Sequence, residues 1–368
     1  MYLKNLTLTN FKNYSEGKIS FSNRINCIVG NNGVGKTNIL DAIHYLSLTK
    51  SFFNNVDGVN IKHGEDFFIL SGVFDSDGEE ETITCSFQRQ KQKSFKRNSK
   101  EYKRLLEHVG RFPVVMMSPA DSVLISAGSE ERRKFMNKII SQFDTVYLDS
   151  VMKYNKALLQ RNRLLKEFKV NNHFDADALS IWNLQLERYG NYIYQERKKL
   201  VEEMIPHFRK FYSIISENKE DVQLSYRSHL DDGDFLSLLD DSLQKDRFLE
   251  YTSCGLHKDD LIFEMDGYPI KMLGSQGQQK SYLTALKLAK YEYIRQKRGV
   301  APILLLDDVF DKFDRNRVEQ IIQIVINDEF GQIFITDSNS NRLEEIIKSQ
   351  NVEYKLFTIE DNNIVCSL

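Results

Sequence analysis

Residues 30–38 read Gly30-Asn31-Asn32-Gly33-Val34-Gly35-Lys36-Thr37-Asn38. They follow the apolar run 25–29 and precede residues 37–48, whose apolar side chains recur at helical spacing. A buried strand, a glycine-rich turn and a helix form the context in which the pattern GxxxxGK[ST] cradles phosphate. The glycines let successive backbone N–H groups turn toward phosphate oxygens, and the helix N-terminus adds its dipole. Residues 30–38 therefore predict a phosphate-binding loop.

Two side chains of this loop have the chemistry that a nucleotide triphosphate requires. The ammonium of Lys36 is expected to neutralise the β and γ phosphates, and the hydroxyl of Thr37 is expected to bind Mg²⁺. ATP and Mg²⁺ are the predicted ligands.

A pair of carboxylates follows the apolar run 303–306. Asp307 and Asp308 come directly after this run, so a parallel sheet places them at the same edge as the phosphate loop. We expect Asp307 to hold the Mg²⁺ shell and Asp308 to position or deprotonate the attacking water, as the catalytic residue of a weak ATPase.

A second phosphate-binding edge is predicted at residues 273–279. Ser275, Gly277 and Gln278 lie there at the start of a helical pattern, 277–298. One ATP has no need of two such cradles in one chain. We therefore expect these residues to contact ATP held by another subunit, which predicts an ATP-dependent homodimer. The alternative is an ordinary loop and helix N-cap.

The length of the chain and its helical patterns predict two domains. The chain has 368 residues, more than one hydrophobic core usually serves. Strand patterns at 3–8, 19–21, 67–74, 81–87, 261–265 and 332–336 flank long charged helical patterns at 146–168 and 176–215. We expect an α/β domain with a mostly parallel sheet, residues 1–117 and 251–368, and a mainly helical insertion, residues 118–250.

Composition excludes several classes of protein. Cys27, Cys85, Cys254 and Cys366 lack the spacing of a zinc site and are expected to be reduced thiols. No apolar run approaches the roughly 18 residues of a membrane span, and the N-terminus lacks the pattern of a signal peptide. These observations predict a cytoplasmic protein with no membrane partner.

DNA contact must come from a local patch, because the formal net charge is only −2. Residues 89–104 are the candidate. They are equally compatible with a solvated hairpin and with a phosphate-binding edge. The basic residues are Arg89, Lys91, Lys93, Lys96, Arg97, Lys100, Lys103 and Arg104.

Several further segments carry a family resemblance. They are Phe11-Lys12-Asn13-Tyr14, residues 33–43, Lys50-Ser51-Phe52, residues 118–121 with Gly128 and 132–135, residues 154–162, and residues 255–260. With the phosphate loop, the SxGQQ segment and the acidic pair in this order, the chain resembles ABC-type ATPases of the SMC kind and, most closely, the RecF family of bacterial recombination mediators. Leu256 and Lys258 depart from the family pattern, where proline and arginine are expected.

The resemblance implies an ABC/SMC-like ATPase head with a helical domain inserted in its sequence. It also implies an ATP-dependent DNA-binding protein of recombinational repair, replication gaps and the SOS response. Such a protein dimerises on ATP as a clamp at single-strand gaps, duplex or their junctions, and works with RecO- and RecR-type mediators to load recombinase. Asp311 would begin the D-loop. The alternatives are a P-loop kinase of a small molecule, which leaves SxGQQ unexplained, and a transporter-type ATPase subunit, which fits the helical insertion poorly.

Overall fold

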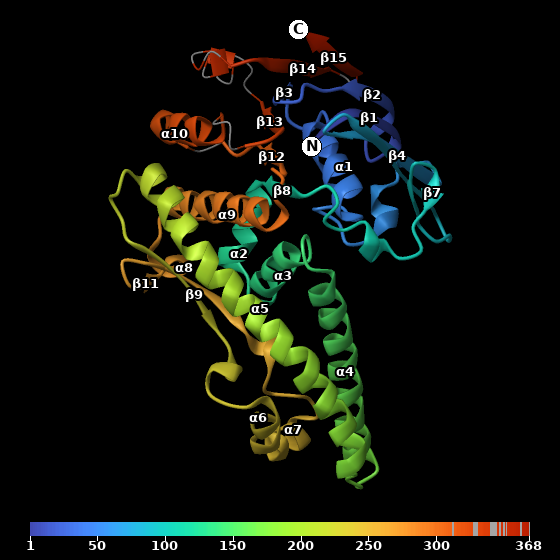
Figure 1. Cartoon of the computed structure of the whole chain (residues 1–368), viewed down its shortest axis with the longest axis vertical. Helices are drawn as coiled ribbons and strands as arrows, with labels where there is room; N and C mark the ends of the chain where they lie inside the picture. Colours follow the sequence, from blue (N-terminus) through green and yellow to red (C-terminus); the bar gives the residue numbers. More distant parts are fainter. Residues whose placement is uncertain are drawn as a thin grey trace. The chain divides into compact units, whose positions relative to one another are not determined.

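The structure is a computed structural model that describes residues 1–310, 313–326, 330–338, 344–345, 347–348, 350, 352–360 and 363–367. The chain forms two compact units. The first comprises Met1–Ser122, Lys210–Lys219 and Lys280–Leu368, and the second comprises Val123–Arg209 and Glu220–Gln279 (Figure 1). These bounds differ from the predicted division at residues 117 and 250, because strands on both sides of residue 250 pair with one another in the second unit.

A mostly parallel six-stranded sheet carries the phosphate loop of the first unit. Its strands, in spatial order, are β15 (Asn363–Ser367), β14 (Tyr354–Glu360), β3 (Ile25–Val29), β13 (Ile333–Asp337), β12 (Ile303–Asp307) and β8 (Val114–Met117). Only the β14/β15 pair is antiparallel. Each residue of β3 and β12 is buried, as expected for strands covered on both faces.

A second six-stranded sheet of the same unit is antiparallel. Its spatial order is β2 (Tyr14–Ser20), β1 (Tyr2–Phe11), β4 (Phe67–Ser76), β5 (Glu79–Gln88), β6 (Ser94–Arg97) and β7 (Lys100–Glu101). Helix α1 (Lys36–Leu48) contacts β4 and β5 of this sheet as well as β8, β12 and β13 of the parallel sheet. It therefore lies between the two sheets.

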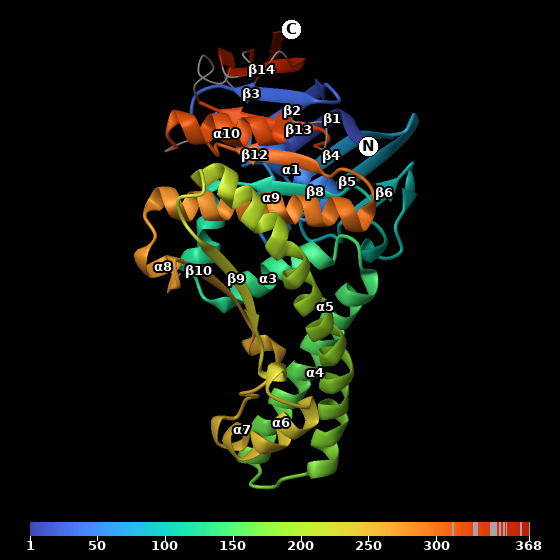
Figure 2. The same ribbon diagram turned by 60° about the vertical axis from the view of Figure 1, so that its left-hand side comes forward.

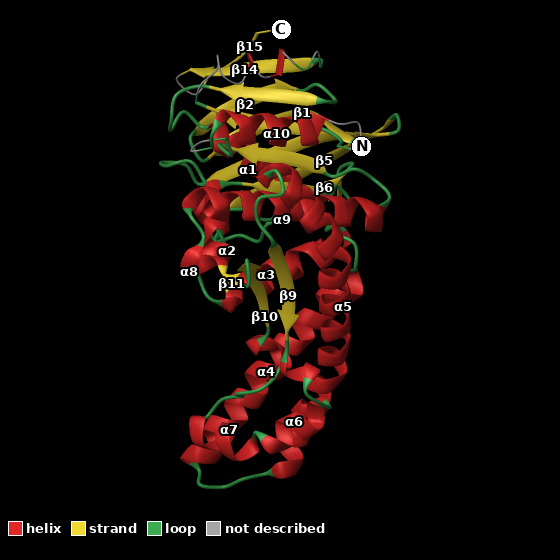
Figure 3. Cartoon of the chain, turned by 90° about the vertical axis from the view of Figure 1, so that its left-hand side faces the viewer, coloured by secondary structure: helices red, strands yellow, loops and turns green. Residues whose placement is uncertain are grey.

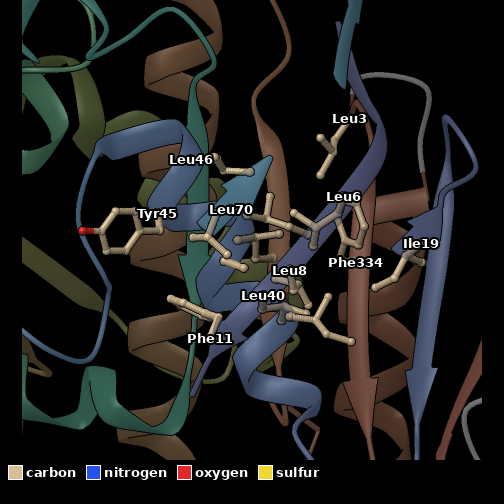
Figure 4. Close-up of a cluster of buried hydrophobic side chains, with 14 of the residues drawn as sticks. Leu3, Leu6, Leu8, Phe11, Ile19, Leu40, Tyr45, Leu46, Leu70 and Phe334 are labelled. Atoms are coloured by element: carbon tan, nitrogen blue, oxygen red, sulfur yellow. The ribbon is translucent and has the colours of Figure 1, made fainter. Parts of the chain in front are cut away.

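The core of the first unit forms around α1. Leu40, Tyr45 and Leu46 of this helix belong to one buried apolar cluster with Leu6 and Leu8 of β1 (Figure 4). All five side chains have no measurable solvent exposure. The start of α1, where the phosphate loop ends, is consequently anchored by a large buried apolar surface. Further helical elements described in this unit are α10 (Arg315–Ile326), most of α9 (Gln276–Arg298), the last residues of α5 (Ala176–Ser216), and the 3₁₀ turns Asp57–Asn60, Leu105–Glu107 and Pro119–Ser122.

Helices dominate the second unit (Figure 3). They are α2 (Val123–Ser126), α3 (Ser129–Ile140), α4 (Thr145–Val170), α5 (Ala176–Ser216, to Arg209), α6 (Phe235–Asp241), α7 (Leu243–Leu249) and α8 (Ile270–Leu273), with 3₁₀ turns at His229–Asp231 and Leu256–Lys258. A small antiparallel sheet has the order β11 (Tyr268–Pro269), β10 (Asp260–Met265) and β9 (Val222–Arg227).

A fully buried arginine ties the helices of this unit together. Arg161 of α4 donates to Asp246 of α7 at 2.6 Å and to Thr252 at 2.8 Å. Its Nε donates to Asn183 of α5 at 2.7 Å. Helix α7 lies against α4 in Figures 1 and 2, in agreement with their contacts. Among the described residues, no helix is both long and apolar enough to cross a membrane.

Candidate nucleotide-binding site

The predicted phosphate loop lies between β3 and α1, and Lys36 is the first residue of the helix. Gly35 has a φ of 109°, a conformation that favours glycine. A Cβ on Gly35 would also lie 2.8 Å from the hydroxyl of Tyr14. Any larger residue at this position would therefore strain the loop and push it away from Asn13 and Tyr14.

Lys36 is held inside the loop. Only 4% of the residue is exposed, and its Nζ donates to the carbonyl oxygens of Gly30 at 2.8 Å and Asn31 at 3.0 Å. These carbonyls orient the ammonium without neutralising it. Its positive charge is therefore available to a phosphate held by the loop.

The hydroxyl of Thr37 and the carboxylate of Asp307 meet across the sheet edge. Thr37 Oγ1 donates to Asp307 Oδ1 at 2.8 Å, although 270 residues separate them. Strand β13 lies between β3 and β12 and contributes Thr336, which donates to the same oxygen at 3.1 Å. Hydroxyl and carboxylate oxygens are the hard ligands that Mg²⁺ prefers, so these two residues fit the predicted metal role.

Burial controls the ionisation of Asp307. Loss of solvent raises the pKa of this carboxyl above its ordinary value, the Thr37 hydroxyl opposes that rise, and the nearby charge of Asp308 adds to it. Ser118 contributes a longer hydrogen bond of 3.4 Å. A cation beside Asp307 would favour its charged form.

Asp308 belongs to the same cavity as the phosphate loop. Its φ of 45° is unusual for a residue with a side chain, and its backbone N–H donates to Thr336 Oγ1 at 2.9 Å. The cavity has a volume of about 310 Å³. It is lined by Asn32, Gly33, Gly35, Lys36, Thr37, Asn38 and Asp308.

Residues of the first hairpin support the loop, a role that sequence spacing did not predict. Asn13 Nδ2 donates to the carbonyl oxygen of Val34 at 3.0 Å, and the hydroxyl of Tyr14 donates to that of Gly35 at 3.2 Å. Asn38 donates to Asn13 Oδ1 at 2.6 Å. The only signal for Asn13 and Tyr14 in the sequence was the family resemblance, since each lies 21 residues before the loop residue that it contacts.

Ser275, Gly277 and Gln278 lie in the second unit, at the start of α9. Ser275 Oγ accepts from the backbone N–H of Gln278 at 3.2 Å, and Gln278 Oε1 accepts from the backbone N–H of Ser275 at 2.7 Å. This reciprocal pair is a capping box. The arrangement satisfies the ordinary N-cap role, while Ser275 itself is exposed. Asp311 and Lys312, where the D-loop is expected, lie outside the described residues.

Comparison with known proteins settles the family. Residues 2–362 match the family described as the RecF/RecN/SMC N terminal domain. The chain is 49% identical to the DNA replication and repair protein RecF of Flavobacterium johnsoniae, covering 98% of this chain and all of the relative. The chain belongs to the RecF family. The RecF protein of Phocaeicola vulgatus is 46% identical, over 99% of this chain and 98% of that protein.

Solved structures agree with membership of the RecF family. A structure described as the recombination mediator protein RecF-ATPrS in the RecFOR pathway is similar, with a TM-score of 0.88 and 30% identity over 100% of this chain and 98% of that one. The Smc head domain of Pyrococcus furiosus has a TM-score of 0.59 at 17% identity, over 100% and 96% of the two chains, and supports the fold alone. The predicted ABC/SMC-like ATPase head is therefore confirmed. The kinase and transporter alternatives find no support among these relatives.

Proposed function

We propose that this RecF-family protein is a cytoplasmic, ATP-dependent, DNA-binding recombination mediator. ATP and Mg²⁺ bind at the cavity around Lys36, Thr37 and Asp307, and two ATP-bound copies form a clamp on DNA at single-strand gaps. The observation that carries the proposal is the direct bond between Thr37 and Asp307, which unites the phosphate loop and the acidic pair at one sheet edge.

The solved relatives support the nucleotide and the pathway. Two structures similar over the whole chain, both with a TM-score of 0.88, are described as the recombination mediator protein RecF with ATP or ATPrS in the RecFOR pathway. We infer partners of the RecO and RecR type from the name of that pathway. Hydrolysis, with Asp308 orienting or deprotonating water, would reopen the dimer and release DNA.

Dimerisation is assigned to the capped start of α9. The hydroxyl of Ser275 accepts a hydrogen bond from the backbone N–H of Gln278, and its own O–H can still donate one. The first N–H groups of a helix also have no acceptor within that helix. An exposed helix start with these donors suits the γ-phosphate of an ATP held by a second copy. Gly277 keeps the approach open.

The test is the molar mass of the protein with ATP and Mg²⁺, measured by light scattering with and without duplex DNA. We expect wild type to dimerise and Ser275→Arg to remain monomeric, because the arginine side chain would occupy the space of the phosphate. ATP binding to the monomer is expected to persist. A wild type that stays monomeric with ATP and DNA would overturn the proposal.

Ser237→Arg is the matched control. Ser237 is an exposed serine in the first turn of α6, in the same unit as Ser275. We expect this variant to dimerise like wild type. If Ser275→Arg dimerises as well as wild type, the start of α9 is not part of the dimer interface. The assignment of the phosphate loop to ATP binding does not depend on that result.

A further inference from the structure

A second concave site lies in the second unit, where α4 ends and α7 packs against it. It has a volume of about 290 Å³. We name it the α4/α7 pocket. Its lining consists of Leu165, Phe168, Lys169, Asn172, His173, Phe174, Gln244, Arg247 and Phe248.

The pocket exposes apolar surface that a folded protein normally covers. Phe248 is 76% exposed, and the adjoining Val170 of α4 is 82% exposed. Phe168 and Phe174 are half-buried, and their rings meet edge to face at 5.3 Å. Clustered aromatic side chains of this kind mark an interaction site more often than isolated exposed residues do.

Two cations flank the aromatic rings. The guanidinium of Arg247 lies 4.4 Å from the ring centre of Phe174, and Lys169 Nζ lies 5.8 Å from that of Phe248. Within the part of the chain that the structure describes, neither cation has an ion pair, and no Asp or Glu lines the pocket. Both charges are therefore available to an anionic group.

The frame of the pocket is fixed by buried bonds. Asp246, next to Arg247 in α7, is fully buried and accepts from Arg161 of α4. It also accepts from the hydroxyl of Ser253 at 2.6 Å. These bonds hold α7 on α4, so the backbone at Arg247 and Phe248 has a fixed position. Binding of a ligand therefore costs little conformational entropy there.

We propose that the α4/α7 pocket binds a short acidic peptide segment of a partner protein that inserts one bulky apolar side chain. The inserted side chain would cover Phe168 and Phe248, while carboxylates beside it would pair with Arg247 and Lys169. Arginine favours such pairs because its planar group binds a carboxylate through two hydrogen bonds. This inference does not depend on the nucleotide site.

The pocket disfavours a nucleic acid as the occupant. Its lining offers two cations, Lys169 and Arg247, and each of them lies beside an aromatic ring. A strand of DNA or RNA would need a longer run of cations to neutralise its successive phosphates, whereas a short peptide segment needs only these two. One face of the Phe174 ring is already covered by Arg247, which reduces the surface on which a base could stack.

Fluorescence anisotropy with the full-length protein tests the proposal. The probes are fluorescein-labelled nonapeptides of Asp and Glu with one central Phe, Trp or Leu, and the same peptide with Gly at the centre. We expect saturable binding of at least one apolar-centred peptide in the micromolar range, and binding at least about tenfold weaker for the glycine peptide.

Charge reversal at the pocket supplies the decisive comparison. Arg247→Glu is expected to weaken peptide binding at least about tenfold, because a charge-assisted pair is replaced by repulsion. Lys166→Glu is the matched control, since Lys166 is an exposed lysine of α4 that does not line the pocket. We expect it to bind like wild type. Phe248→Ala, at an exposed position, tests the apolar contact without changing charge.

Three results would overturn the proposal. They are the absence of saturable binding to any of the probes, equal binding of the glycine peptide, and equal loss in Arg247→Glu and Lys166→Glu. A labelled twenty-residue oligothymidine is measured in parallel. If Arg247→Glu weakens the oligothymidine but none of the peptides, the pocket belongs to nucleic acid instead.

Discussion

Two charged regions of the first unit are organised in opposite ways. At the nucleotide site, Lys36 is 4% exposed and Asp307 3% exposed, and each has fixed partners at hydrogen-bond distance. Along residues 89–104, which follow β5 and include β6 and β7, most cations are exposed. In the first region each charged group is held at a fixed position by its hydrogen-bond partners, so the region suits one ligand of defined shape. The second offers only summed charge, which suits a surface of repeating phosphates.

The basic run is itself divided. Arg97 pairs with Glu81 at 2.8 Å, and Lys93 pairs with Asp57 at 3.0 Å, so both serve the fold. The exposed members without an ion pair to any described residue are Arg89, Lys91, Lys96, Lys100 and Lys103. These five are candidates for contact with DNA, and the four lysines among them are replaced in the variant described below.

The largest expected effect is at Asp308. We predict that Asp308→Asn lowers the rate of ATP hydrolysis by about 10²–10⁴-fold, the range for losing a general base, while ATP still binds. Single-turnover hydrolysis with radiolabelled ATP measures the rate. Asp66→Asn, at an exposed carboxylate of the same unit, is expected to match wild type. A rate within threefold of wild type would move the role to another residue.

Lys36→Ala tests the phosphate loop at the level of binding. Its ammonium is the buried charge that faces the loop, and a lost charge-assisted hydrogen bond costs about 1.5–3 kcal/mol, or roughly 10–150-fold in affinity. Equilibrium binding of a fluorescent ATP analogue measures the loss. Lys18→Ala removes an exposed lysine of β2 and serves as the control. Unchanged affinity in Lys36→Ala would contradict the assignment.

Asp307→Asn separates stability from function. Burial raises the pKa of Asp307, so ionising this group costs more in the folded chain than in the unfolded one. Asp307 therefore favours the folded state in its protonated form, which is present at low pH, and this contribution to stability is lost as the pH rises through the raised pKa. Asparagine keeps an oxygen for Thr37 and Thr336 but carries no charge. We therefore expect a higher midpoint of thermal unfolding near pH 7 in EDTA without nucleotide.

The same variant is expected to lose Mg²⁺-dependent ATP binding, since it lacks the anionic ligand. The stability difference should shrink as the pH falls, because wild-type Asp307 becomes neutral as well. Thermal unfolding between pH 4 and 8 measures both trends. A difference that grows toward low pH would show that the buried carboxylate is not its cause.

Local pattern predicted the elements of the nucleotide site well. The predicted strand 25–29 and the observed β3 coincide, and the predicted helix 37–48 begins one residue after α1. These segments have strong periodicity or a motif that requires one geometry. The acidic pair was placed at the end of a strand for the same reason, and β12 does end at Asp307.

Partners that are distant in sequence were not predictable in this way. Strand β8 is a run of only four residues, Val114–Met117, and it becomes a strand because β12 pairs with it. Strand β9 lies within the predicted helical insertion and pairs with β10, some 40 residues later. The support from Thr336 and Ser118 to Asp307 likewise depends on strand order, which no local pattern encodes.

The smallest effect per residue is expected in the basic run. We predict that replacing Lys91, Lys96, Lys100 and Lys103 with glutamine weakens DNA binding across sequences. The plot of log affinity against log salt has a negative slope, and each lost phosphate contact makes this slope less steep by about 0.9 on duplex. Four lost contacts would make it less steep by about 3.6. Because these side chains have no ion pair with the described residues, the variant is expected to keep its thermal stability and its ATP affinity.

The control must remove equal charge from another surface, so that a general change in net charge is separated from lost contacts. Four exposed lysines of the second unit serve, each replaced by glutamine: Lys156, Lys166, Lys199 and Lys245. Titrations of labelled duplex at four salt concentrations compare the slopes of the two variants. If the salt dependence becomes less steep only in the variant with glutamine in the basic run, residues 89–104 contact DNA phosphates. Equal slopes in both variants and in wild type would show that residues 89–104 form a solvated hairpin that does not bind DNA. The contrast with the nucleotide site would then be one between a site that binds a ligand and a surface that binds none.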